Sequence, residues 1–247
     1  MTDDELLAVL HRTKAAILDA LAAIDDWTPT TGAITHTQYA IDVAADEPAI
    51  EVLTAAGLGV LSEESGLHAD DRDVVVVMDP VDGSTNASRG VPWFATSLCA
   101  VDEQGPRVAL VENLATGERF EAVRGRGATR NGVAISVSGQ TDITRALVCM
   151  TGIPLTYGPW AQGRVMGAAA LDLCSVGNGR FDAYVDNTAG IHGPWDYMGG
   201  MLVVTEAGGV VADVQGRDLV TLEHTARRGP IAAATPELLQ RMLEQHA

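Results

Sequence analysis

Basic residues are scarce in this sequence. Lysine and arginine together number 16, aspartate and glutamate number 33, and the formal net charge is −17 at pH 7. Proteins that bind nucleic acid or an anionic membrane through their surface present positive patches. The charge balance therefore argues against both kinds of partner.

Cysteines and long apolar runs are also few. Cys99, Cys149 and Cys174 are widely spaced and each has apolar neighbours. This pattern indicates free, buried thiols in a reducing compartment, and it argues against a disulfide framework or a zinc site. No apolar run approaches the length of a membrane-spanning helix, and the acidic residues 3–5 replace the basic start of a signal peptide. We expect a cytoplasmic protein.

The chain has enough apolar residues for a large core, because 47% of its 247 residues are apolar. Apolar spacing predicts an amphipathic helix over 3–24, followed by a polar segment at 25–37. Further helices are expected at 42–54, 164–176, 195–207 and 236–245. Strands are expected at 60–61, 74–78, 96–101, 108–113, 120–123, 135–137, 146–151, 183–186 and 210–214. This alternation predicts a mixed α/β or α+β fold.

The most informative segment follows the apolar run 74–78. Residues 79–86 read Asp-Pro-Val-Asp-Gly-Ser-Thr-Asn. A β-branched run that ends in acids is typical of a buried strand whose last carboxylates, here Asp79 and Asp82, reach water or a metal. The serine and threonine after the turn can cap a helix whose N–H groups point at the same place. Such a site holds phosphate through divalent cations. The alternative is an ordinary strand-to-turn junction.

Further acids lie at separated places in the chain. A second short apolar run ends at Glu63 and Glu64, and Asp42 and Asp46 are four residues apart, so they share one face of the expected helix. Asp196 opens the helix rich in small residues expected at 195–207.

Three of these segments resemble the signatures of the inositol monophosphatase family. They are residues 63–65, residues 79–86, and residues 195–196 together with 206–209. Their order and approximate spacing are the family's, and the resemblance covers nearly the whole chain. It implies a lithium-sensitive, Mg²⁺-dependent phosphomonoesterase that forms a homodimer.

The resemblance also implies the fold. We expect the layered α-β-α-β-α sandwich of the inositol monophosphatase and fructose-1,6-bisphosphatase type. Its N-terminal half would cover residues 1–140 and carry the metal motif, and its C-terminal half would cover residues 141–247. No linker or repeat separates the halves, so one compact unit is expected.

The metal ligands follow from the same resemblance. Glu63, Asp79 and the carbonyl of Val81 would hold one Mg²⁺, whereas Asp79, Asp82 and Asp196 would hold a second. A pair of ions about 4 Å apart can hold the attacking and leaving oxygens of a phosphoryl transfer. Clustered carboxylates repel one another until such ions bind. The excess of acids in this chain favours a metal-assisted mechanism, since an acidic protein otherwise repels a phosphorylated substrate.

Other positions receive roles from the resemblance. We assign catalytic roles to Glu63, Ser84 and Asp46: Ser84 would orient the attacking water, and Asp46 would polarise that hydroxyl or bind a weaker third Mg²⁺. Gly83 and Ser84 would offer backbone N–H groups to the phosphate. Asp186 would contact hydroxyl groups of the substrate.

Four other residues are interpreted mainly as structural. Thr85 and Asn86 are expected to act as caps, His192 as a packing or hydrogen-bonding residue, and Trp195 as a core anchor that positions the acid after it. For Glu64 two interpretations stay open, namely a water-mediated contact to the third metal and a solvated surface acid.

The sequence departs from the family at two places. Residues 35–38 lack the usual lysine, and Gly167-Ala168 lacks a hydroxyl beside the expected pocket of the leaving group. Both departures concern the loop and the pocket rather than the metal ligands.

The substrate therefore stays open. Inositol monophosphate is the first candidate, and histidinol phosphate, a 3′(2′),5′-bisphosphate nucleotide and fructose 1,6-bisphosphate are alternatives. A bisphosphate requires additional cationic residues, for which the sequence offers only Arg89 and Arg164 near the motifs. A non-catalytic, partner-binding relative is an alternative from another class, but the complete set of carboxylates argues against it.

Overall fold

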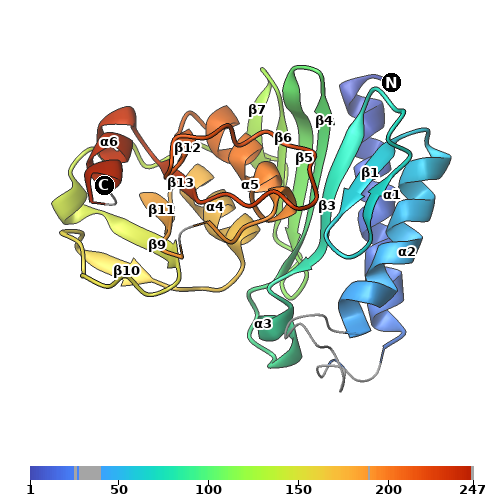
Figure 1. The fold of residues 1–247 in the computed structure, drawn as a ribbon, viewed down its shortest axis with the longest axis horizontal. Helices are drawn as coiled ribbons and strands as arrows, with labels where there is room; N and C mark the ends of the chain where they lie inside the picture. Colours follow the sequence, from blue (N-terminus) through green and yellow to red (C-terminus); the bar gives the residue numbers. More distant parts are fainter. Residues whose placement is uncertain (25–26, 28–39, 189, 246–247) are drawn as a thin grey trace.

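Two β-sheets and three layers of helices alternate through the molecule (Figure 1). The computed structural model describes residues 1–24, 27, 40–188 and 190–245. Helices α1 and α2 cover one face of an eight-stranded sheet, α4 and α5 fill the space between the two sheets, and α6 covers the outer face of a five-stranded sheet. This arrangement confirms the predicted α+β class and its α-β-α-β-α layers.

The elements have the following bounds. The helices are α1 (Asp3–Ala22), α2 (Ala40–Ala55), α3 (Ser84–Ser88), α4 (Ala169–Gly177), α5 (Pro194–Glu206) and α6 (Pro236–Glu244). The strands of the larger sheet are β1 (Gly59–Ser62), β2 (Gly66–His68), β3 (Val75–Asp82), β4 (Ala95–Asp102), β5 (Gly105–Asn113), β6 (Arg119–Val123), β7 (Gly127–Arg130) and β8 (Val133–Ala134). Those of the smaller sheet are β9 (Leu147–Thr151), β10 (Gln162–Arg164), β11 (Ala183–Asp186), β12 (Val210–Asp213) and β13 (Pro230–Ala233).

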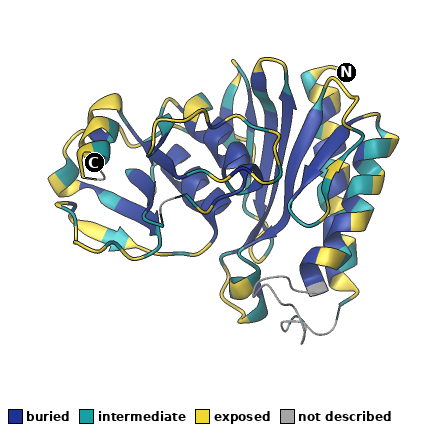
Figure 2. Cartoon of the chain, viewed as in Figure 1, coloured by how far each residue is buried: buried dark blue, intermediate teal, exposed yellow. Residues whose placement is uncertain are grey.

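Strand β3 lies inside the larger sheet and is buried along its whole length, with β1 parallel on one side and β4 antiparallel on the other. Val76 and Met78 pack toward α1 and α2, whereas Val75 and Val77 pack toward α4 and α5. A strand buried on both faces needs apolar side chains at every position. This explains the uninterrupted apolar run in the sequence, and Figure 2 shows the burial.

A bulge interrupts the pairing of β3 with β4. Asp79 lies opposite Ser97, but Asp82 lies opposite Ala95, so two residues of β3 face one residue of β4. In a regular strand, side chains three residues apart point to opposite faces. The extra residue changes this alternation. As a result, Asp82 reaches the amide of Ala170 at the start of α4.

Helices α4 and α5 pack closely because small residues line their contact. A Cβ added at Gly200 would lie 2.6 Å from the Cβ of Leu173 and 3.0 Å from the carbonyl oxygen of Ala170. Glycine there allows the backbones of α4 and α5 to approach each other closely. No described helix is long and apolar enough to cross a membrane.

Several details of the expected secondary structure were wrong. The helix predicted over 164–176 starts only at Ala169, because Gly167 has a φ of +90° and cannot be helical, and the preceding residues form β10. The strand predicted over 135–137 is absent, since the amide of Ile135 bonds to Ala128 and that of Val137 bonds to Ala207. Strands β2, β7, β8, β10 and β13 had not been predicted.

Candidate metal centre

Three carboxylates from distant parts of the sequence meet between the sheet and α5. Glu63 follows β1, Asp79 lies in β3, and Asp196 lies in the first turn of α5. One oxygen of each lies within 4.8 Å of the others. Hard, anionic oxygens at this spacing fit a divalent cation such as Mg²⁺.

Local structure fixes each of the three acids. Because β1 and β3 are parallel neighbours, they end at the same edge, and the amide of Glu63 donates to the carbonyl of Met78 at 3.1 Å. Asp79 accepts a hydrogen bond from the amide of Val81 at 2.9 Å. Asp196 accepts one from the amide of Gly193, the N-cap residue of α5, at 2.7 Å.

The three carboxylates of the cluster are buried and repel one another. Burial, together with the charges of Asp196 and Glu64, raises the pKa of Glu63 to about 8. Burial also raises the pKa of Asp196 to about 7, although the Gly193 amide opposes the shift. For Asp79, burial and the charge of Glu63 raise the pKa well above its usual range. Without metal, the cluster therefore keeps protons near neutral pH.

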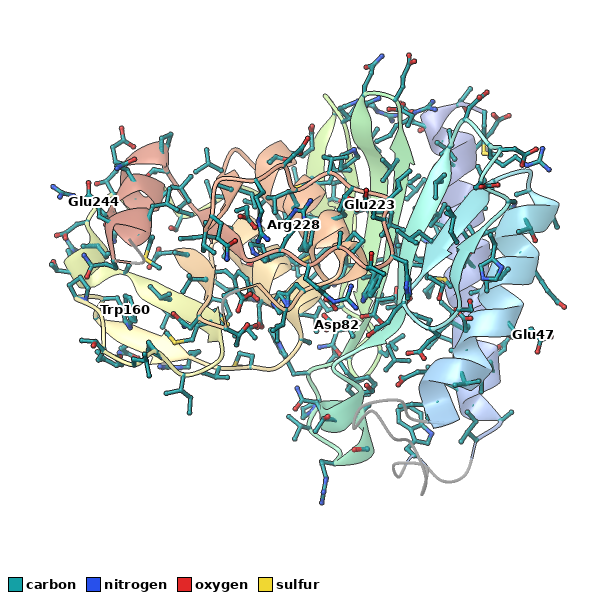
Figure 3. All side chains as sticks on the ribbon, in the orientation of Figure 1. Glu47, Asp82, Trp160, Glu223, Arg228 and Glu244 are labelled. Carbon is teal, nitrogen blue, oxygen red and sulfur yellow. The ribbon has the colours of Figure 1, made fainter. Side chains whose placement is uncertain are left out.

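Asp82 lies beside this cluster rather than within it. Its Oδ2 accepts a hydrogen bond from the amide of Ala170 at 2.7 Å, and burial followed by the charge of Asp196 raises its pKa well above the usual range. Figure 3 shows Asp82 where β3 leaves the larger sheet. The second ligand set predicted from the sequence, together with the carbonyl of Val81, stays a prediction.

Asp46 has a different partner from the one expected. It is buried on α2 and accepts a hydrogen bond from the hydroxyl of Ser62, whose oxygen in turn accepts the amide of Glu64 at 3.1 Å. No hydrogen bond between Asp46 and Ser84 occurs among the described residues.

Ser84 is the first residue of α3, and Gly83 caps that helix with a φ of +86° and without a side-chain cap. The expected capping by Ser84 and Thr85 is therefore wrong.

Asp186 is engaged by its own loop. One carboxylate oxygen accepts the amide of Thr188 at 2.8 Å and also its hydroxyl, and the other accepts the amide of Gly190 at 3.2 Å. The predicted contact with substrate stays a prediction.

His192 is buried and bonds through Nε2 to the hydroxyl of Tyr184 at 2.7 Å, and its Nδ1 lies 3.9 Å from Asp196. Its interpretation as a packing and hydrogen-bonding residue agrees with these contacts.

Two residues beside the cluster had escaped the sequence analysis. The Nε2 atom of His224 lies 2.9 Å from the carbonyl oxygen of Glu63, and its ring lies 4.9 Å from that of Trp195. The guanidinium of Arg227 lies 5.1 Å from the centre of the Trp195 ring. Both residues are more than 160 positions from Glu63, so no local pattern could place them there. Residues 35–38, where the usual lysine is missing, lie outside the described residues.

A group of polar contacts ties the turn after β3 to the start of α4. The side-chain amide of Asn86 donates to the carbonyls of Trp93 and Met166, both at 2.8 Å. The indole of Trp93 donates to Oδ1 of Asp172 at 2.8 Å. Asn86 thus bridges two loops and does not serve as the expected cap. Asp172 is fully buried, its Oδ2 has no hydrogen-bond partner among the described residues, and burial raises its pKa to about 7.

We expect the Asp172→Asn variant to melt at a higher temperature than the wild type at pH 8. The folded-state pKa lies above the usual 3.8, so stability falls as pH rises from about 4 and the loss is complete above about 7. Asparagine keeps the acceptor for Trp93 and carries no charge. Thermal melts from pH 5 to pH 8 should show the advantage growing with pH, and an advantage that is constant or shrinks with pH would contradict this account.

Comparisons with known proteins agree with this geometry. The model of the inositol monophosphatase family matches residues 30–247. A protein of Pasteurella multocida named "Nus factor SuhB" is 34% identical over 224 residues, which cover 83% of this chain and 80% of that protein. A protein of Archaeoglobus fulgidus named "Fructose-1,6-bisphosphatase/inositol-1-monophosphatase" is 34% identical over 226 residues, covering 89% of this chain and 84% of that protein.

Solved structures show the same fold. A hypothetical protein from Pyrococcus horikoshii, reported with similarities to inositol-1 monophosphatase, superposes with a TM-score of 0.83 at 27% identity, covering 98% of this chain and 96% of the other. Inositol monophosphatase from Anabaena superposes with a TM-score of 0.80 at 25% identity, with the same coverage of 98% and 96%.

Proposed function

The chain belongs to the inositol monophosphatase family, and from this premise we propose that it is a Mg²⁺-dependent phosphomonoesterase of a small phosphorylated polyol. Inositol monophosphate is the first candidate substrate. The family is one of metal-dependent phosphatases. The observation that supports the proposal best is the convergence of Glu63, Asp79 and Asp196 within 4.8 Å.

The donor set fits the metal. In the proposal, Glu63, Asp79 and the carbonyl of Val81 would hold one ion, and Asp79, Asp82 and Asp196 a second. Bound there, Mg²⁺ would neutralise phosphoryl oxygens, acidify a water molecule and stabilise the leaving oxygen. The raised pKa values of the cluster are consistent with ligands whose repulsion a cation relieves.

The protein's own residues would position the reacting groups. The chain of hydrogen bonds from Asp46 through Ser62 to the amide of Glu64 holds the turn that carries Glu63. Asp46 is therefore proposed as a positioning residue for Glu63, which would accept a proton from the attacking water. Ser84, next to Asp82 at the start of α3, is proposed to orient that water.

A screen for phosphate release tests the function directly. Purified protein with Mg²⁺ would be offered inositol 1-phosphate, histidinol phosphate, fructose 1,6-bisphosphate and adenosine 3′,5′-bisphosphate. We expect release from at least one of them, and its loss when the metal is chelated. No release from any phosphomonoester, or release that survives chelation, would contradict the proposal.

The names of two relatives keep other functions open. The Pasteurella protein is named a Nus factor, so we keep a non-catalytic, partner-binding role as an alternative for this chain. The complete carboxylate set in this chain favours catalysis over such a role alone. The name of the Archaeoglobus protein pairs a bisphosphatase with a monophosphatase, which supports bisphosphates as a second candidate class.

We also propose that the protein forms a homodimer, from the family resemblance. Light scattering, which measures the molar mass in solution, tests this.

We predict that lithium inhibits this activity at millimolar concentrations and uncompetitively with respect to substrate. A small monovalent cation can enter an oxygen-ligand site, but it lacks the double charge that the next step requires. The site of Asp79, Asp82 and Asp196 is the expected target. Steady-state rates over a matrix of lithium and substrate concentrations would show this. Purely competitive inhibition, or none at any concentration, would contradict the prediction.

A further inference from the structure

A long segment of the C-terminal half crosses from the smaller sheet to the larger one. Residues 214–229 leave β12, run to the larger sheet and return to β13 (Figure 1). The hydroxyl of Tyr197 donates to the carbonyl of Leu219 at 2.7 Å, which ties the segment to α5. In Figure 3, Glu223 of this segment lies beside the larger sheet. The next residue, His224, contacts two parts of the metal centre.

The first contact of His224 is a hydrogen bond to the backbone of Glu63. Its Nε2 atom lies 2.9 Å from the carbonyl oxygen of Glu63. A carbonyl oxygen can only accept, so Nε2 carries the hydrogen in this contact. The amide of Glu63 donates in turn to the carbonyl of Met78 at 3.1 Å. Glu63 is thus held through both of its backbone polar groups, one by the N-terminal half and the other by the C-terminal half.

The second contact of His224 is with the start of α5. The centroid of its ring lies 4.9 Å from that of Trp195, and the two planes are inclined by 35°. Trp195 is 3% exposed and directly precedes Asp196, and its carbonyl accepts the hydroxyl of Ser97 at 3.1 Å. The Nη1 atom of Arg227 donates to the carbonyl of His224 at 2.8 Å. His224 is therefore itself fixed, by a buried ring on one side and a hydrogen bond to its backbone on the other.

The turn that carries Glu63 lies at the edge of the larger sheet. Residues 63–65 connect β1 to β2, which is the outermost strand, and Ser62 pairs with Gly66 where the hairpin closes. Turns at a sheet edge have fewer contacts than strands inside the sheet and open more easily. Asp79, by contrast, lies in β3, which pairs with a strand on each side. The position of Glu63 therefore depends more on a contact from outside the sheet.

We propose that His224 is a positioning residue of the metal centre, and that its hydrogen bond holds Glu63 at the distance from Asp196 that the cation requires. The inference rests on the proposed metal-dependent function. Glu63 comes from the N-terminal half and Asp196 from the C-terminal half, so the separation of their carboxylates depends on how the hairpin turn sits against α5. His224 links the two, since it bonds to Glu63 and packs on the residue before Asp196. Residues that orient metal ligands in this way contribute about 10- to 100-fold to metal affinity.

Two replacements of His224 separate the role of its hydrogen bond from that of its ring. His224→Phe keeps a ring for Trp195 and removes the donor, whereas His224→Gln keeps an N–H donor and removes the ring. Titration calorimetry of the purified protein with Mg²⁺ measures affinity without any substrate. We expect the dissociation constant to rise about tenfold in His224→Phe and to stay within about threefold of the wild type in His224→Gln. His11→Phe, on α1 at the opposite face of the larger sheet, is the matched control and should bind Mg²⁺ as the wild type does.

Hydrogen exchange in the metal-free protein gives a second measurement. Without the bond from His224 the hairpin turn should open more often, so the amides of Glu63 and Glu64 should exchange about tenfold faster in His224→Phe than in the wild type. In His224→Gln their exchange should stay close to that of the wild type. Thermal melts in chelator show that each variant is folded.

The competing explanation is that His224 only packs against Trp195. Wild-type Mg²⁺ affinity in His224→Phe, or an equal loss of affinity in both replacements, would then be found, and either result would overturn the proposal. Weaker binding by His224→Phe with unchanged exchange at Glu63 would overturn it as well, because the effect would not pass through the turn. A wild type that binds no Mg²⁺ would contradict the proposed metal-dependent function together with this role, whereas the other contrary results concern His224 alone.

Discussion

The Asp79→Asn variant is expected to retain less than about a hundredth of the wild-type kcat, a loss of about 2.7 kcal/mol or more in transition-state stabilisation. Asp79 is the most buried of the three clustered acids, and its proposed role is to bridge both cations. Asparagine keeps the shape and the acceptor for the amide of Val81, but it removes the charge. Steady-state kinetics at saturating Mg²⁺ measure the change.

The same variant should not unfold. In the absence of metal, Asp79 is repelled by Glu63 and Asp82, so its removal should leave the melting temperature in chelator unchanged or raise it. Asp71→Asn, at a side chain 74% exposed, serves as the matched control and should behave as wild type in both measurements. Retention of more than about a tenth of kcat by Asp79→Asn, or about 1.4 kcal/mol of barrier, would show the bridging assignment to be wrong.

The sequence predicted the parts of the site that depend on local order. The apolar run before Asp79 predicted a strand buried on both faces, and the acids that end it were expected to reach water or a metal. The parallel pairing of β1 with β3 then brings Glu63 to the same edge. These features are encoded within a few residues, so a family pattern captures them.

Other parts of the site depend on contacts that no short pattern encodes. The bulge after Asp79 sets the direction of Asp82, and the partner of Asp46 is Ser62 because β1 happens to face α2. Arg227 lies over the ring of Trp195 because the segment between β12 and β13 returns to the start of α5. Asp186 accepts hydrogen bonds from its own loop, which the sequence did not show, and its assignment to substrate contact stays a prediction.

The predicted start of the helix at residue 164 was wrong for a related reason. Residues 164–168 before α4 do not exclude a helix by their types alone, and only the left-handed Gly167 shows where the helix can start. That conformation is fixed by tertiary contacts, since a Cβ at Gly167 would lie 3.1 Å from the side chain of Asn86. Helix propensity depends on residue types alone, so it does not predict the left-handed conformation of Gly167.

Stabilisation of the protein by Mg²⁺ is expected to depend strongly on pH. The pKa of Glu63 is raised from 4.5 to about 8, and that of Asp196 from 3.8 to about 7. Each folded-state value lies above the unfolded one, so the stability that these two groups contribute to the metal-free protein is fully present below about pH 4. This contribution falls as pH rises and is lost above about pH 8.

Mg²⁺ must displace the protons that Glu63 and Asp196 hold below these pKa values. At pH 6 most of the ligand set would be protonated, whereas at pH 8 the carboxylates are ionised and bind the cation more tightly. An excess of Mg²⁺ about 100-fold above its dissociation constant stabilises by about 2.7 kcal/mol, which for a chain of this size raises the melting temperature by about 5–10 °C. We expect this gain at pH 8 and a clearly smaller one at pH 6.

Thermal melts with chelator and with Mg²⁺, at both pH values, measure the gain directly. KCl at matched ionic strength shows how much of it is simple screening, which should be little for groups this deeply buried. Asp172 titrates in the same range but is expected to contribute equally with and without metal, so it cancels from the difference. An equal gain at both pH values, or a larger one at pH 6, would mean that the clustered carboxylates are not the ligands. The pH dependence of Mg²⁺ binding would then have to come from acids other than Glu63, Asp79 and Asp196.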